Sequence, residues 1–189
     1  NIGEAAGRLS GLITNILRLN KLEHQRIDPE IEAYDLCAQL EECILNYEEM
    51  WDEKDLELEV DMEEKAVVDA DKSLMELVWN NLLSNAVKFT ETGGKVTVRQ
   101  TSSDGYAVVE VTDTGCGMSR ESIRHIFDKF YQGDTSHSKE GNGLGLALVS
   151  RILMLMGGDI SVASEEGRGS TFMVRIPVPP ETGKTDRRE

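Results

Sequence analysis

The sequence has only three cysteines in 189 residues and no long apolar run. Cys37, Cys43 and Cys116 show no CxxC spacing and have no histidine at metal-ligand spacing, so neither a zinc site nor a disulfide framework is indicated. No stretch approaches the roughly 18 apolar residues of a membrane span, and the polar start at Asn1 is unlike a signal peptide. The sequence therefore predicts a soluble chain.

Basic residues are also scarce. The chain has 20 of them against 35 acidic residues, which gives a formal charge of -15. A surface of this sign does not attract nucleic acid or anionic lipid, so we expect proteins or small molecules as partners. An anionic nucleotide can still bind where backbone amides, a metal ion and a few lysines make the local field positive.

The chain divides into a helical start, one globular domain and a tail. Apolar residues from Ile2 to Leu22 recur at alternating steps of three and four, which predicts a helix with a heptad seam and favours packing on a partner helix over burial on its own domain. Asp28-Pro29 ends this helix. We assign residues 1–27 to the helix, 28–178 to the domain and 179–189 to a disordered tail. Because the chain starts in mid-helix without a methionine, we expect it to be a fragment.

Hydrophobic periodicity and turn residues predict the elements of the domain. Helices are expected from the caps Asp35 and Asp71 to about Trp51 and Phe89, and over residues 144–156. Strands are expected at residues 32–34, 56–62, 66–69, 95–101, 106–112, 159–163 and 170–176. The polar run between Gly133 and Gly143 predicts a mobile loop. About three helices and five or six strands, with prominent hairpins, indicate the α+β class with helices on one face of a largely antiparallel sheet.

Asparagines gather on one face of the helix expected between Asp71 and Phe89. Asn81, Asn85 and, one step round, Lys88 can point into one pocket because residues four apart share a helix face. Amide oxygens can hold a magnesium ion, and a lysine can meet phosphate oxygens. The alternative, that these residues are simply the wet side of an amphipathic helix, is equally compatible with this stretch alone.

Three glycine-containing segments follow. Asp113-Thr114-Gly115-Cys116-Gly117-Met118 comes directly after a strand, where a carboxylate can accept from the exocyclic amine of adenine, although Asp-Thr-Gly also makes ordinary turns. Gly141 to Leu146 opens a helix, which suits a phosphate site or a flexible loop. Gly167 to Phe172 is a hairpin turn from which the Thr171 hydroxyl could reach a pocket water or the Asp113 carboxylate.

Taken with Phe127-Asp128-Lys129-Phe130-Tyr131, these motifs stand in the order and spacing of the ATP-binding domain of sensor histidine kinases, over about Asp28 to Pro177. The resemblance implies the Bergerat-type (GHKL) ATP fold shared with gyrase B, Hsp90 and MutL. Such a fold is a two-layer α/β sandwich with a mixed sheet of about five strands and three helices. Mg²⁺ and ATP would lie under a mobile lid, here Gln132 to Asn142.

The resemblance also implies a role for each matching residue. Asn85 resembles the magnesium ligand, and Asp113 resembles the residue that reads adenine. The other nucleotide contacts implied are the phosphate-binding Asn81 and Lys88, the base-lining Gly115, Gly117 and Met118, the phosphate- or ribose-approaching Lys129 and Tyr131, the phosphate-wrapping Gly143, Leu144 and Gly145, and Thr171 in support of Asp113.

The N-terminal stretch resembles the second helix of the dimerisation and phosphoacceptor hairpin, whose first helix carries the phosphorylated histidine. The resemblance thus implies a protein-histidine kinase fragment of a two-component system, which passes the ATP γ-phosphate to a histidine that the fragment lacks and, through it, to a response regulator. It further implies a cytoplasmic location, with a parent that could be membrane-anchored, and a homodimer through the N-terminal helix. His24 and His125 are expected to be solvated or structural, and His137 lies in the lid.

Three other functions are weighed against the same motifs. Hydrolysing relatives place a glutamate base where this chain has Asn81, and an amide cannot take a proton, so a GHKL-type ATPase is disfavoured. A non-enzymatic module that binds ATP and reports through its helix is compatible with the same motifs. A serine kinase of the anti-sigma type shares the pocket but would not need the heptad helix.

Overall fold

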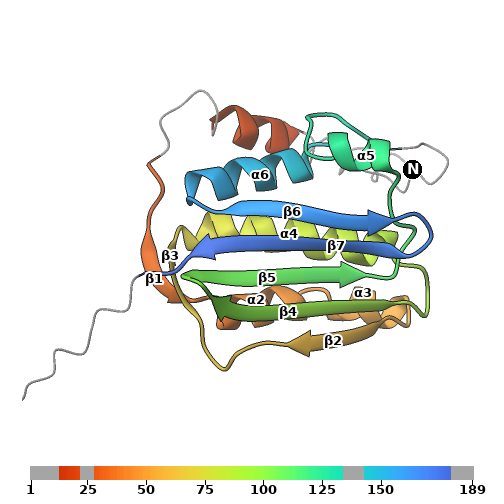
Figure 1. The fold of residues 1–189 in the computed structure, drawn as a ribbon, viewed down its shortest axis with the longest axis horizontal. Helices are drawn as coiled ribbons and strands as arrows, with labels where there is room; N and C mark the ends of the chain where they lie inside the picture. The colour runs from red at the N-terminus through yellow and green to blue at the C-terminus, as the bar shows by residue number, and fades with distance from the viewer. Residues whose placement is uncertain (1–12, 22–27, 134–142, 180–189) are drawn as a thin grey trace, which may run out of the picture.

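The computed structural model describes residues 13–21, 28–133 and 143–179 (Figure 1). Its main sheet has five strands, in the spatial order β2 (Glu57–Asp61), β4 (Lys95–Ser103), β5 (Tyr106–Asp113), β7 (Gly169–Pro177) and β6 (Asp159–Glu165). β2 runs parallel to β4, and every other neighbour pair is antiparallel. β1 (Glu32–Asp35) and β3 (Val67–Ala70) form a separate two-stranded ribbon. The predicted α+β class and the mixed five-stranded sheet are confirmed.

The sheet is covered by helices on one face. Figure 1 shows α2 (Leu36–Leu45), α3 (Glu48–Glu53) and α4 (Lys72–Phe89) behind it. Burial alternates along β5 accordingly, since Ala107, Val109, Val111 and Asp113 are buried while the residues between them are partly exposed. The open face carries exposed ion pairs such as Arg175 with Asp159 at 2.8 Å. Because successive side chains of a strand point to opposite faces, only every second residue can reach the helices.

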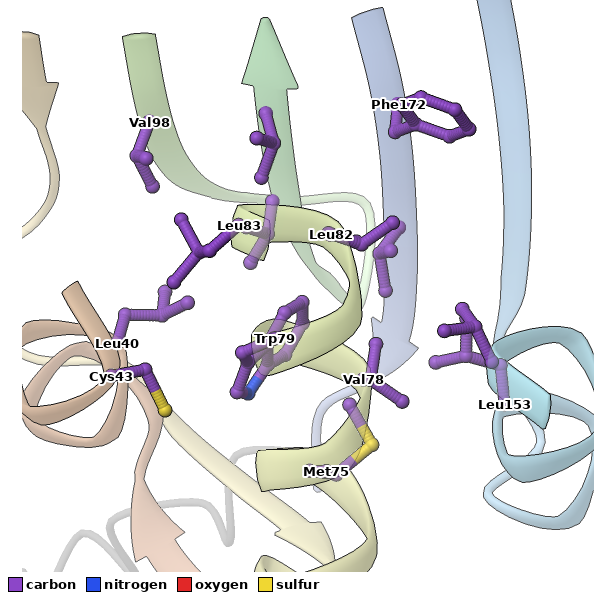
Figure 2. Close-up of a cluster of buried hydrophobic side chains, with 14 of the residues drawn as sticks. Leu40, Cys43, Met75, Val78, Trp79, Leu82, Leu83, Val98, Leu153 and Phe172 are labelled. Atoms are coloured by element: carbon purple, nitrogen blue, oxygen red, sulfur yellow. The ribbon is translucent and has the colours of Figure 1, made fainter. Parts of the chain in front are cut away.

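The core lies between this face and α4. Trp79 is completely buried, and its indole N–H donates to Oε1 of Gln39 at 3.0 Å. The Gln39 amide nitrogen in turn donates to the carbonyl of Lys72 at 2.7 Å, so the polar groups of Trp79 and Gln39 are both satisfied. Figure 2 shows side chains of α2, α4, α6 (Gly145–Leu155) and the sheet converging around Trp79. Burying one large apolar side chain in this cluster stabilises the fold by about 1.5–3 kcal/mol.

Both predicted caps are present. The Asp35 carboxylate accepts from the Cys37 amide at 3.1 Å, and that of Asp71 accepts from the Leu74 amide at 3.0 Å. The expected helix from Asp35 to Trp51 is wrong, because it is broken between α2 and α3. The Trp51 indole donates to the Ile44 carbonyl at 3.2 Å, and the Tyr47 hydroxyl donates to the Asn80 carbonyl at 3.0 Å. These contacts satisfy a helix-end carbonyl and fix the turn, which helical periodicity alone does not reveal.

Residues 13–21 are helical, as expected. Leu19 is only 5% exposed and belongs to the domain's own core, whereas Ile13 and Leu17 are about half exposed, at 48% and 57%. The prediction that the heptad seam avoids its own domain is therefore wrong at Leu19, and the seam positions before residue 13 and after residue 21 lie outside the described residues. Among the helices that the structure describes, none combines the length and the apolar character needed to cross a membrane.

Candidate nucleotide site

The Asp113 carboxylate closes β5 on the helix-covered face. Asp113 is 6% exposed, and its Oδ1 accepts from the Gly115 amide at 2.9 Å. Burial raises the pKa of this carboxyl group, while hydrogen bonds from the backbone of Gly115 and Ser170 oppose the rise. A buried acceptor held by backbone amides, rather than paired with a cation, is suited to a neutral donor such as an amine.

The glycine loop after Asp113 is held by close backbone approaches. A Cβ atom at Gly115 would overlap the carbonyl oxygen of Phe89 at the end of α4. Gly117 has a φ of 64°, and a Cβ there would overlap the carbonyl oxygen of Glu165, the last residue of β6 before the β6–β7 turn. The Gly167 amide of that turn donates to the Cys116 carbonyl at 2.7 Å. The two glycine-rich segments thus support each other, and only glycine fits at position 117 of their contact.

The predicted phosphate end combines α4 with the start of α6. Asn81 donates its side-chain N–H to the Leu77 carbonyl at 2.7 Å, so its oxygen is the free end. That oxygen lies against Gly145, where a Cβ would overlap it. The N-cap residue of α6 is Leu144, which has no side-chain oxygen to cap the helix, and the first amides of a helix are groups from which an anion can accept. The structure therefore brings the asparagine motif and the glycine segment that opens α6 into contact.

Two other α4 residues lie further along the same helix. Asn85 is partly buried one turn after Asn81. The Lys88 ammonium lies over the ring of Phe89, the last residue of α4, at 4.7 Å from the ring centroid. The metal and phosphate roles of Asn85 and Lys88 stay predictions.

The Phe127 to Tyr131 segment follows α5 (Arg120–His125). The Tyr131 hydroxyl donates to Oγ of Ser122 at 3.3 Å, and Lys129 is exposed. The Phe130 amide donates to the Gly143 carbonyl at 2.8 Å, so residues far apart in sequence meet there. Gly143 has a φ of 65°, which requires glycine. Lys129 and Tyr131 therefore lie near the start of α6, but no contact joins them to Asp113 in the part of the chain described.

Other predicted site residues are located as follows. Leu144 is completely buried at the start of α6, and Met118 is partly buried against the core. His125 lies on the short helix α5, where its Nδ1 is 2.8 Å from Oδ2 of Asp128, which fits the structural role expected for it. The predicted lid, apart from residues 132 and 133, together with Gly141, His24 and His137, lies outside the described residues.

The prediction that Thr171 supports Asp113 is wrong. The register pairs Asp113 with Ser170 and Thr112 with Thr171. Successive strand residues point to opposite faces, so the Thr171 hydroxyl lies on the open face, 3.0 Å from that of Thr112. Ser170, which is buried on the same face as Asp113, is the residue that the motif reasoning missed.

Two further residues were missed. The Lys54 ammonium lies at the C-terminal end of α4 and donates to three backbone carbonyls, those of Val87, Lys88 and Thr90. Ser164 of β6 lies opposite Ser170, with 3.0 Å between their hydroxyl oxygens. Neither residue belongs to a recognisable motif: strand pairing brings Ser164 beside Ser170, and packing brings Lys54 to the end of α4.

Comparison with known proteins agrees with this geometry. Residues 70–180 match the family described as "Histidine kinase-, DNA gyrase B-, and HSP90-like ATPase". The sensor protein SrrB of Staphylococcus aureus is 29% identical over 174 residues, covering 91% of this chain and 30% of that protein. The chain therefore spans about a third of the length of such curated relatives.

Solved structures give the same result. Full-length ShkA in complex with AMPPNP has a TM-score of 0.82 at 29% identity, covering 92% of this chain and 36% of that one. The nucleotide-free catalytic domain of the histidine kinase ThkA has a TM-score of 0.71 at 26% identity, covering 78% of this chain and 95% of that one. The chain belongs to the histidine kinase-, DNA gyrase B- and HSP90-like ATPase family and has the fold of a sensor histidine kinase catalytic domain.

Proposed function

We propose that this chain binds ATP with Mg²⁺ and transfers the γ-phosphate to a histidine on a phosphoacceptor domain, as the catalytic part of a sensor histidine kinase. The observation that carries the proposal is the buried Asp113 carboxylate, which is held by backbone amides at the strand end. The family match and the AMPPNP complex of the related ShkA support the choice of nucleotide.

In this proposal adenine donates its exocyclic amine to Asp113 and lies against the Gly115 to Met118 loop. The phosphates then extend toward the first amides of α6, where Gly145 allows that helix to lie against the Asn81 oxygen. Lys88 contributes positive charge, and the Asn85 amide oxygen is the protein ligand for Mg²⁺. Within the described residues no cluster of three or more histidine, cysteine or carboxylate side chains could hold a metal, so phosphate oxygens would complete the shell.

Transfer to an external nucleophile is favoured over hydrolysis. The Asn81 amide has no basic site, and its N–H is already donated to the Leu77 carbonyl. Its oxygen can accept from a water and its second N–H can donate to a phosphate oxygen, but the amide cannot remove a proton from that water. The chain's contribution to catalysis is then positioning and charge stabilisation while the γ-phosphate passes in line to an imidazole nitrogen, as is usual in phosphoryl transfer.

The wider partners follow from this assignment. A histidine-bound phosphoryl group would be passed to a response regulator, and the N-terminal helix would pair with a second copy. Cytoplasmic ATP and a response regulator would place the domain in the cytoplasm.

The test combines binding with transfer. Calorimetry with Mg²⁺ should detect ATP binding, and labelled ATP should then label a separately produced phosphoacceptor hairpin only when this chain is present. Absence of binding overturns the proposal. Binding without transfer would favour a nucleotide-gated interaction module, and steady-state hydrolysis without an acceptor would favour an ATPase.

A further inference from the structure

Three polar side chains form a row across the helix-covered face of the sheet. Asp113 of β5 pairs with Ser170 of β7, and Ser170 pairs with Ser164 of β6. Side chains of directly opposite residues lie about 5 Å apart, so a base bound at Asp113 is next to Ser170. Ser164 lies one strand further from the base and acts on it only through Ser170.

The hydrogen bonds fix where the protons lie. The Ser164 hydroxyl donates to the Gly169 carbonyl at 2.9 Å, and a serine hydroxyl has only one proton to donate. In the 3.0 Å contact between the two hydroxyls, Ser170 must therefore be the donor. With its proton committed to Ser164, Ser170 presents only lone pairs to any neighbour. The row then offers two acceptors side by side, the Asp113 carboxylate and the Ser170 oxygen.

We infer that Ser164 is a positioning residue for nucleotide selection: by holding the Ser170 proton, it makes the site accept a 6-amino purine and reject a 6-oxo purine. The inference rests on the proposed ATP function. An exocyclic amine has two N–H donors, which match two acceptors directly or through a water. A 6-oxo group presents an acceptor at the same place, so the Ser170 oxygen meets no donor there, which is costly. Without Ser164, the Ser170 hydroxyl can turn and donate to the oxo group.

The test compares ATP with ITP, which carries a 6-oxo purine and the same ribose and triphosphate. The dissociation constants of both nucleotides are measured with Mg²⁺ for the original chain, for Ser164→Ala and for Ser161→Ala. Ser161 is a matched control because it lies on the same strand, exposed and pointing to the open face. We expect Ser164→Ala to lower the ratio of the ITP constant to the ATP constant about fivefold, the effect of one hydrogen bond. Ser161→Ala should leave it unchanged.

The ratio of the two dissociation constants separates base selection from protein stability, because a destabilised fold weakens the binding of both nucleotides alike. Ser164→Thr keeps the hydroxyl and should keep the ratio, while Ser170→Ala removes the second acceptor and should lower it. An unchanged ratio in Ser164→Ala overturns the inference and leaves the proposed function intact if the original chain binds ATP. If the original chain binds neither nucleotide, the proposed function itself fails.

Discussion

Replacing Asp113 with asparagine should separate what this carboxylate does for the fold from what it does for the ligand. The substitution keeps size and shape, and the asparagine oxygen can still accept from the Gly115 amide. The negative charge is lost, and with it half of the acceptor capacity for an adenine amine. A hydrogen bond to a charged group contributes about 1.5–3 kcal/mol, so ATP affinity should fall about 10- to 100-fold.

The stability of the empty protein should change in the opposite direction. In the unfolded chain the carboxyl titrates near its ordinary value of about 3.9, whereas burial raises its pKa in the folded chain. The folded state thus holds the proton more tightly. This group's stabilising contribution is complete below the unfolded pKa and is lost as pH rises through the folded pKa. At neutral pH the buried charge is therefore a cost, and Asp113→Asn should melt at the same temperature as the original chain or above it.

Calorimetric titration with Mg-ATP and thermal unfolding between pH 4 and pH 8 measure both effects. The difference in melting temperature should shrink toward the acid end, where the original carboxyl group is protonated. Asp69→Asn on the exposed side of β3 is the control and should change neither quantity. Unchanged ATP affinity in Asp113→Asn would refute the base-reading role. A clear loss of stability at neutral pH would show that the fold depends on the carboxylate.

Three further outcomes are expected. Gly145→Ala places a Cβ against the Asn81 oxygen and should weaken ATP about tenfold in calorimetry with little loss of stability, whereas equal affinity would remove this contact from the site. Lys54→Met removes the cation that donates to the end of α4 and should lower the free energy of unfolding by about 1–3 kcal/mol in urea, with partial recovery in Lys54→Arg. Cys116 should react first with a thiol reagent, because burial raises the pKa of Cys37 and Cys43 to about 11. Fast labelling that persists in Cys116→Ser would contradict this.

Features that depend on a few neighbouring residues were predictable from the sequence. Asp35 and Asp71 cap their helices as expected, because an N-cap needs only a side-chain oxygen and the amides two or three residues on. The β4–β5 hairpin was equally clear, since Asp104 and Gly105 both adopt the positive φ that a tight hairpin turn requires. Local chemistry fixes these elements before any packing.

Features that depend on distant partners were not predictable in the same way. The break before Tyr47 is fixed by a hydrogen bond to Asn80, which lies 33 residues further along the chain. The parallel pairing of β2 with β4, and the separate β1–β3 ribbon, come from long-range strand choices that no local pattern records. The cap that Lys54 provides for α4 belongs to the same class, because nothing in the residues around it indicates its partner helix.

The motif predicted Thr171 where the structure places Ser170, which shows why a motif can locate a site and still misassign one of its residues. A motif places both residues beside β5, but a strand has a period of two, so a shift of one residue moves a hydroxyl to the other face of the sheet. The register is fixed by Gly169, which has a φ of 105° and lies so close to the Asp113 carbonyl oxygen that a Cβ would overlap it. That contact places Ser170 opposite Asp113 and turns Thr171 away. A glycine with no side chain thus decides which hydroxyl can meet the base.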